Sequence, residues 1–278
     1  MLPLCEIKDT DLNKPGIVII DARGGKDSWQ RYMAGHLKNA IYADLDKHLA
    51  ASVTDAAVGG RHPLPEIKDF ATLLGTWGIT PDSHVIVYDD KSAANSAARL
   101  WWMLQAIGHE KVQVINGGLQ AAIHASVPLS TDVYTPVPAV PYPVTLTYKG
   151  TADITETAAA AQDDHRLVID VRETARYLGQ TEPIDLIAGH IPGAVNLPYV
   201  KNLDADGNYL PAEALRKAYE EVLTNVEPEN VIVHCGSGVT ACHTLLGMAH
   251  AGIIGPKLYV GSWSEWSRRG LPIATDKR

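Results

Sequence analysis

The order of sequence patterns in the first half of the chain recurs in the second half, and this internal repeat most constrains the fold. An apolar run that ends in Asp-x-Arg occurs at residues 17–23 and again at 167–172. A second apolar run occurs at residues 85–89 and again at 231–235. A period of about 146 residues that preserves the order of these patterns indicates a duplicated domain, because solenoid repeats are only about 20–50 residues long.

Each copy is predicted to be an α/β domain. Short runs of β-branched residues alternate with stretches of helical spacing in both halves, which is typical of a mainly parallel central sheet with helices on both faces. Five prolines lie between residues 127 and 143, where periodicity is weak, as in an extended linker. We therefore predict a first domain at residues 1–130, a Pro-rich linker at 131–146 and a second domain at 147–278.

The second copy carries a cysteine at the end of its apolar run. Residues 231–233 are strand-like and residues 242–251 have helical spacing, so Cys235 is expected in a loop between a strand and a helix N-terminus. Free backbone amides and the helix dipole stabilise an anion at such a place, and we expect Cys235 to be a thiolate nucleophile. Gly236 and Gly238 allow the loop to turn its N–H groups inward. The alternative is an ordinary buried cysteine, which is a common environment for this residue.

The first copy lacks this nucleophile. Asp89 occupies the position equivalent to Cys235, and none of the three residues that follow it is a glycine. Ligands of open parallel sheets bind beyond the carboxyl ends of the strands. The sequence therefore predicts a single catalytic site in the second domain, while the first domain serves as a scaffold and as one wall of an active-site cleft.

Composition excludes several classes of function. The net charge is −8 and no run of Lys and Arg occurs, which argues against nucleic-acid binding. No apolar stretch reaches the roughly 18–20 residues of a membrane span, and the N-terminus has no export signal, so we expect a cytoplasmic protein that does not bind membranes. Three cysteines fit reduced thiols better than disulfides. His243 and His250 share a helix, but no third residue has metal-ligand spacing, and we expect neither a metal nor a cofactor.

Two motifs connect the repeat to a known family. Residues 189–194 read Gly-His-Ile-Pro-Gly-Ala, and residues 235–241 read Cys-Gly-Ser-Gly-Val-Thr-Ala after the last apolar strand. With the tandem copies, they resemble the tandem-domain rhodanese sulfurtransferases, and the cysteine loop is similar to the 3-mercaptopyruvate version rather than the thiosulfate version. The resemblance implies that Cys235 takes a sulfur atom from 3-mercaptopyruvate, or from thiosulfate, as a persulfide. It then implies transfer to cyanide, a thiol or thioredoxin, with substrate sulfur held by the loop residues Gly236, Gly238, Val239 and Thr240.

The resemblance also implies a group of residues that moves a proton. Ser237 matches the serine of the family loop, although a turn hydroxyl bound to its own backbone is an equal alternative. His62 resembles the family histidine that precedes a Leu-Pro pair, and Asp46 resembles its acidic partner. Such a relay would protonate the enolate that mercaptopyruvate leaves behind. The alternative for His62 and Asp46 is that they are surface-turn residues.

The resemblance also implies how the carboxylate of the donor is bound. Arg176 matches the first of two arginines that bind it in the mercaptopyruvate enzymes, and a guanidinium suits bidentate recognition of a carboxylate. The second arginine is expected after Glu182-Pro183, where this chain has Ile184-Asp185. This departure weakens the case for mercaptopyruvate as the donor.

Two other functions compete with this one. Cysteine phosphatases also place a thiolate in an amide-lined loop, but they have an arginine at the sixth position after the cysteine to bind phosphate. In this chain that position is Ala241. A non-catalytic persulfide carrier would receive sulfur from a protein and hand it on through protein contacts. One small domain would suffice for a carrier, so the second domain favours an enzyme.

Overall fold

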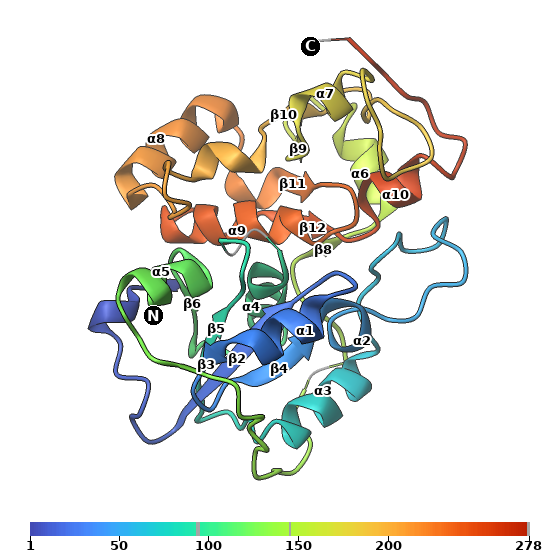
Figure 1. Ribbon diagram of the computed structural model, residues 1–278. Coiled ribbons are helices and arrows are strands. Elements are labelled where there is room, and N and C mark those ends of the chain that lie inside the picture. Colours follow the sequence, from blue (N-terminus) through green and yellow to red (C-terminus); the bar gives the residue numbers. More distant parts are fainter. Residues whose placement is uncertain (93–94, 145, 277–278) are drawn as a thin grey trace. The chain divides into compact units, whose positions relative to one another are not determined.

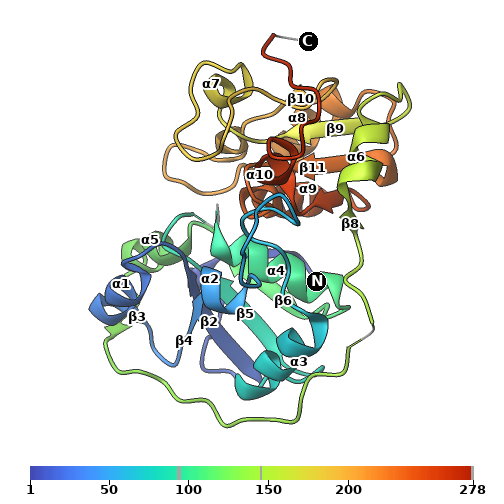
Figure 2. The same ribbon diagram turned by 90° about the vertical axis from the view of Figure 1, so that its right-hand side faces the viewer.

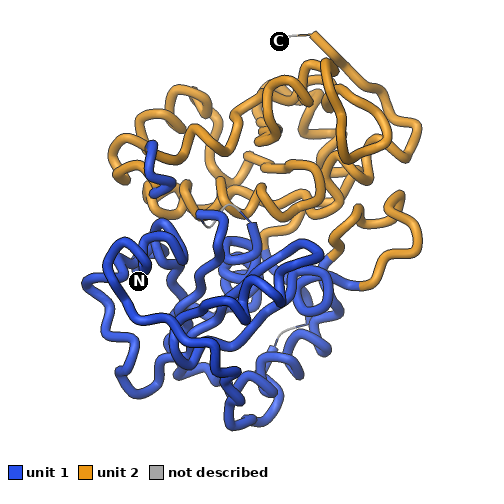
Figure 3. Tube along the Cα trace, in the orientation of Figure 1, with its two compact units in different colours: residues 1–51, 64–149, 205–208 blue, residues 52–63, 150–204, 209–278 orange. Residues whose placement is uncertain are grey.

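Figure 1 shows the computed structural model of the protein, which describes residues 1–92, 95–144 and 146–276. Residues 93 and 94 of the predicted first domain, residue 145 of the predicted linker and the last two residues of the predicted second domain lie outside the described residues. The chain forms two compact units, distinguished by colour in Figure 3. Unit 1 comprises residues 1–51, 64–149 and 205–208, and unit 2 comprises residues 52–63, 150–204 and 209–278.

Unit 1 is built on a parallel sheet of five strands. Their order across the sheet is β1 (Leu4–Cys5), β6 (Val112–Ile115), β5 (His84–Tyr88), β2 (Ile17–Arg23) and β4 (Ile41–Asp44). Two further strands, β3 (His36–Leu37) and β7 (Leu129–Ser130), pair with each other in antiparallel fashion.

Unit 2 repeats the same arrangement. Its five parallel strands have the order β8 (Thr151–Ala152), β12 (Lys257–Tyr259), β11 (Val231–His234), β9 (Leu167–Asp170) and β10 (Val195–Asn196). Each strand corresponds in position to one strand of unit 1, so the repeat detected in the sequence is a repeat of the sheet. The predicted α/β class with two mainly parallel sheets is confirmed.

Helices cover both faces of each sheet (Figures 1 and 2). In unit 1 they are η1 (Ile7–Asp9), α1 (Ser28–Ala34), α2 (Leu45–His48), α3 (Ile67–Thr76), α4 (Ser96–Ala106) and α5 (Gly118–His124). In unit 2 they are α6 (Ile154–Ala160), α7 (Thr174–Tyr177), η2 (Tyr199–Asn202), α8 (Ala212–Leu223), η3 (Pro228–Asn230), α9 (Thr240–His250) and α10 (Ser262–Trp266). Among the described residues, none of these helices combines the length and the apolar character that crossing a bilayer requires.

The core of unit 2 follows from the alternation of side chains along its strands. Val168 and Ile232 point to one face, where they pack with Trp263 and Trp266 of α10 and with residues of α6. Helix α9 packs on the strands β11 and β12 and contacts α8. Both faces of the sheet are therefore covered, and fully buried strands such as β11 can be apolar at successive positions.

The segment that joins the two repeats is extended and runs along unit 1. The N–H group of Ala139 donates to the carbonyl of Gly75, and the N–H group of Tyr142 donates to the carbonyl of Ala71. Tyr142 is buried and its hydroxyl lies 2.9 Å from Nδ1 of His109. The proline-rich composition keeps this segment out of the sheet, because proline has no N–H to donate to a strand partner.

Candidate active site

Cys235 is the first residue of the loop between β11 and α9. Strand β11 lies between β9 and β12, so its carboxyl end opens near the middle of the sheet. The cysteine is 2% exposed. Helix α9 begins at Thr240 rather than at the predicted residue 242, which brings its first-turn N–H groups closer to the cysteine. The strand, loop and helix arrangement expected from the sequence is present.

Helix α10 determines how this loop is turned. The N–H group of Trp263 donates to the carbonyl of Cys235 (3.0 Å), and the N–H group of Ser264 donates to the carbonyl of Gly236 (2.8 Å). The C=O and N–H groups of one trans peptide unit point in opposite directions. The N–H groups of Gly236 and Ser237 consequently point away from α10, on the side where the loop can hold an anion.

Gly238 has a backbone conformation that favours glycine. Its φ is +70°, and a methyl group on its Cα would lie 2.4 Å from the carbonyl oxygen of Val260. Val239 and Thr240 follow as the N-cap and the first residue of α9. The glycine therefore permits the tight turn that leads from the cysteine into the helix.

The structure brings His62 to the cysteine loop. Its Nδ1 lies 2.8 Å from Oγ of Ser237, which is itself buried. The segment 52–63 belongs to unit 2, and two hydrogen bonds hold it there. The N–H group of Gly59 donates to Glu265 Oε1 (3.1 Å), and that of Arg61 donates to Ser264 Oγ (3.0 Å). A hydroxyl next to the nucleophile is thus joined to an imidazole that can exchange a proton with it.

Asp46 lies in unit 1, in the short helix α2. Its N–H group donates to Oδ1 of Asp44, which caps the helix. A contact between Asp46 and His62 would join the two units, and it stays a prediction.

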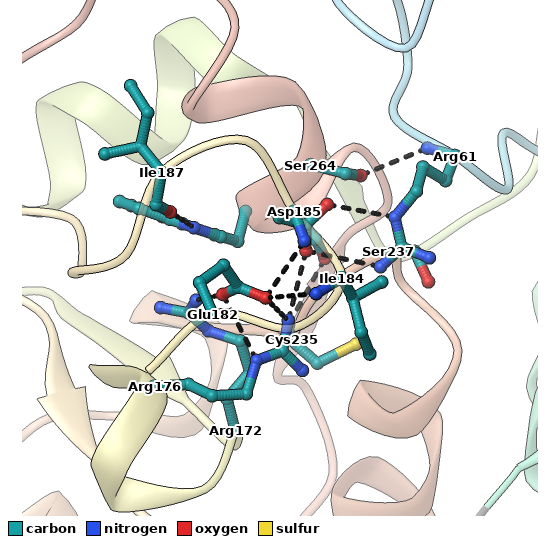
Figure 4. A network of polar contacts seen from close by, with 12 residues as sticks. Arg61, Arg172, Arg176, Glu182, Ile184, Asp185, Ile187, Cys235, Ser237 and Ser264 are labelled. Carbon is teal, nitrogen blue, oxygen red and sulfur yellow. Dashed lines mark hydrogen bonds and ion pairs between the residues drawn. The ribbon is translucent and has the colours of Figure 1, made fainter. Parts of the chain in front are cut away.

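A cluster of charged side chains lies beside the loop (Figure 4). At its centre is the carboxylate of Asp185, whose side chain has no exposed surface. Arg61 donates to it from Nε (2.9 Å) and Nη2 (3.3 Å), and Arg176 donates from Nη2 (3.1 Å). Arg268 lies 3.5 Å away at Nη1. Arg176, the predicted donor-binding residue, therefore lies in this cluster, whereas the sequence predicted no site role for Arg61, Asp185 or Arg268.

Glu182 completes the cluster. It accepts hydrogen bonds from Nε (3.2 Å) and Nη2 (2.8 Å) of Arg176. Burial raises the pKa of its carboxyl group, but the bonds from Arg176 and from the N–H groups of Asp185 and Ile184 outweigh this effect, and the net pKa is lowered. Burial likewise lowers the pKa of Arg176, whereas pairing with Glu182 more than compensates and the net pKa is raised. Both groups are therefore charged at neutral pH.

The guanidinium groups approach the cysteine loop itself. A methyl group built on Gly236 would lie 3.1 Å from Nη2 of Arg61, 3.4 Å from Oδ2 of Asp185 and 3.5 Å from Nη2 of Arg176. Gly236 follows the nucleophile directly, so a bound molecule that reaches Cys235 also comes close to this charged cluster. Glycine at this position keeps the space open.

Some arginine and histidine residues occur at equivalent positions of the two units, and they have equivalent partners in each unit. Arg172 donates to Asp170 (2.6 Å) and to the carbonyl of Gly189 (2.6 Å), and Arg23 donates to Asp21 and to the carbonyl of Gly35 in the same way. His190 and His36 each stack on a tyrosine, with ring centroids 3.6 and 3.8 Å apart. These pairs hold the fold together in both copies, because unit 1 carries them without the nucleophile.

Asp89 takes the place of the cysteine in unit 1. Its carboxylate accepts hydrogen bonds from the N–H groups of Lys91 (2.8 Å) and Ala97 (3.2 Å). Its carbonyl accepts from Leu119, as that of Cys235 accepts from Trp263. A fixed carboxylate thus uses loop and helix N–H groups that would otherwise be available to a bound anion.

Among the described residues of both units, no group of three His, Cys, Asp or Glu side chains could hold a metal ion.

Comparison with known proteins decides the family. The model of the rhodanese-like domain matches the chain twice, at residues 7–125 and 153–269. The chain belongs to the rhodanese family. This confirms the relationship expected from the repeat and the two motifs, and each match falls mainly within one of the two described units.

Known relatives span this rhodanese nearly from end to end. A protein named probable 3-mercaptopyruvate sulfurtransferase from Pseudomonas aeruginosa is 36% identical over 95% of this chain and 94% of its own. A thiosulfate sulfurtransferase from Bos taurus is 32% identical, over 93% of this chain and 87% of its own. Among solved structures, 3-mercaptopyruvate sulfurtransferase from Leishmania major is 32% identical with a TM-score of 0.76, covering 92% of this chain and 75% of that one.

Proposed function

We propose that this rhodanese is a sulfurtransferase that moves a sulfur atom from a small donor to a thiol acceptor through a persulfide on Cys235. The observation that carries the proposal is the loop after β11, in which a buried cysteine is followed by N–H groups turned to one side and by a serine bound to His62. The names of the relatives support the reaction type.

The first half-reaction forms the persulfide. The Cys235 thiolate attacks the sulfur of 3-mercaptopyruvate and forms an S–S bond, while the C–S bond breaks and its electron pair stays on carbon as the enolate of pyruvate. A proton delivered through Ser237 and His62 to this carbon releases pyruvate. Asp46 is proposed to orient His62, and Ser237, His62 and Asp46 thus form the proton relay.

The second half-reaction regenerates the thiolate. An acceptor attacks the outer sulfur of the persulfide, and the electron pair of the S–S bond returns to Cys235. The N–H groups of the loop formed by Gly236, Gly238, Val239 and Thr240 stabilise negative charge on either sulfur. Cyanide, a small thiol and thioredoxin are the proposed acceptors, and the predicted cytoplasmic location fits the three free cysteines.

For the donor, we favour 3-mercaptopyruvate over thiosulfate. Arg176 is proposed to bind the carboxylate of the donor, since its guanidinium lies close to Gly236 in the cluster described above. The carrier function is less favoured because the relay of Ser237 and His62 has no use in direct exchange between two sulfur atoms. Phosphate-ester hydrolysis is disfavoured because Ala241 in the first turn of α9 cannot bind phosphate as an arginine would.

The proposed reaction is tested by replacing the nucleophile. Wild-type protein supplied with 3-mercaptopyruvate and cyanide should release pyruvate and thiocyanate in equal amounts with saturation kinetics. Cys235→Ser should abolish both products, because a hydroxyl at the end of β11 cannot form the persulfide. Wild-type protein that accepts sulfur from a protein donor but from no small donor would instead establish the carrier function.

A further inference from the structure

We propose that a pocket at the edge of the unit 2 sheet binds a small carboxylate with an apolar body. The pocket is lined by residues of α7, β10 and η2 and has a volume of about 330 Å³, which is within the range of small-molecule sites. None of its lining residues belongs to the Cys235 loop or to the charged cluster beside that loop. The pocket is therefore a binding site in addition to the one that holds the sulfur donor.

Four side chains give the pocket apolar walls. Tyr177 and Pro198 are buried, whereas Leu178 and Val195 are half-buried. The hydroxyl of Tyr177 donates to the carbonyl of Ala194 (2.7 Å), so its ring is held in place. A wall that is already fixed lowers the entropic cost of binding a ligand.

The polar wall of the pocket is fixed by the side chain of Asn196. Its Nδ2 donates to the carbonyls of Asp170 (3.0 Å) and Arg172 (2.9 Å), and its Oδ1 accepts from the hydroxyl of Thr174 (2.8 Å). A carboxamide has two N–H groups, and both are used here. The side chain of Asn196 consequently shapes the pocket and has no N–H group left for a ligand.

Two other groups can donate to a ligand at this wall. The N–H group of Leu197 donates to the carbonyl of Asp170, and successive residues of a strand direct their N–H groups to opposite sides. The N–H group of Asn196 therefore faces the open edge of the sheet, where β10 ends the strand order. The second group is the exposed ammonium of Lys201, which has no hydrogen bond or ion pair with any residue that the structure describes.

These donors and walls determine the class of ligand. One donor carries a full positive charge, so the pocket favours an anion. A carboxylate has two oxygens, one for each donor, and its hydrocarbon part can cover the apolar walls. A phosphate would place further charged oxygens against those walls without partners, which costs free energy.

The test compares 3-phenylpropionate with its uncharged analogue 3-phenylpropionamide. The two molecules differ only in the group expected to contact Lys201. Titration of ¹⁵N-labelled wild-type protein with 3-phenylpropionate should shift the amide signals of residues 174–178 and 195–201 to saturation, with a Kd of about 1 mM or lower. The amide should bind about 10-fold more weakly. In Lys201→Gln, the affinity for 3-phenylpropionate should fall to that of the amide, because the charge-assisted hydrogen bond is lost.

Lys217→Gln is the matched control. It removes the same charge from α8, where Lys217 is exposed and has no partner among the described residues, and it should bind as the wild type does. Leu178→Trp should fill the pocket and abolish binding of both molecules, and thermal unfolding shows whether each variant retains the fold.

Three results would overturn the proposal. They are the absence of a saturable shift at these signals, equal affinity for the carboxylate and the amide, and wild-type affinity in Lys201→Gln or Leu178→Trp. The titration uses neither a sulfur donor nor an acceptor, so its result does not depend on the proposed sulfurtransferase function.

Discussion

At the residue scale, the residues around Cys235 differ in how well the sequence predicts that they belong to the site. Cys235 and Ser237 share one loop, which its glycines and the apolar strand before it predict directly, and the resemblance to a family predicts His62. The pairing of Arg61 with Asp185 spans 124 positions and leaves no periodic pattern. Its one sequence signal was the acidic residue at a place where an arginine was expected. Contacts between loops depend on the folded backbone, so local patterns could not have predicted them.

The contact between His62 and Ser237 predicts a dependence on the donor. Mercaptopyruvate leaves an enolate that needs a proton, whereas thiosulfate leaves sulfite, which is a stable anion without one. In His62→Gln, the rate of persulfide formation should fall about 100-fold with 3-mercaptopyruvate and less than about 3-fold with thiosulfate. The measurement is single-turnover labelling of Cys235 with each donor. Losses of the same size with both donors would show that His62 only positions the loop.

At the element scale, strands were easier to predict than the segments that complete the site. The runs at residues 85–89 and 231–235 correspond closely to β5 and β11, because a buried parallel strand needs successive apolar residues. Helix α9 begins two residues earlier than its apolar pattern, at Thr240 after an N-cap valine that carries no capping signal. Segment 52–63 has no periodicity, and its place in the first repeat gave no sign that it packs with unit 2.

The burial of β11 predicts a pH dependence of stability. His234 lies in this strand without exposed surface, and burial lowers its pKa, although Asp170 at 3.8 Å opposes the effect. Below about pH 6.5 the unfolded chain binds a proton at this histidine more readily than the folded chain does, so the free energy of unfolding decreases as the pH falls. The thermal unfolding midpoint should drop between pH 7 and pH 5, and His234→Gln should reduce this drop. An identical drop in the variant would contradict this account of His234.

At the scale of the whole molecule, duplication explains most of what the sequence could reveal. Two sheets with the same strand order follow from two copies of one pattern. The difference between the copies is chemical, because Asp89 fills the position of Cys235 and its carboxylate binds the surrounding N–H groups. The molecule is therefore expected to have one sulfur-binding residue.

The other two cysteines are poorly suited to the reaction. Burial raises the pKa of Cys5 to about 11, so its thiol is protonated at neutral pH. Cys242 is buried in α9, where its Sγ donates to the carbonyl of Gly238 at 3.4 Å. Neither is expected to form a persulfide, since the thiolate is the reactive species.

The role of Cys235 as the residue that carries the sulfur is tested most directly by counting and locating the sulfur atoms that the donor alone adds to the protein. Protein is incubated with 3-mercaptopyruvate without an acceptor, and intact mass and peptide mapping are recorded for the wild type and for Cys235→Ser. We predict one added sulfur atom per wild-type chain, located on Cys235, and none in the variant. A sulfur atom on Cys5 or Cys242 in the wild type, or an added sulfur in Cys235→Ser, would contradict the central claim.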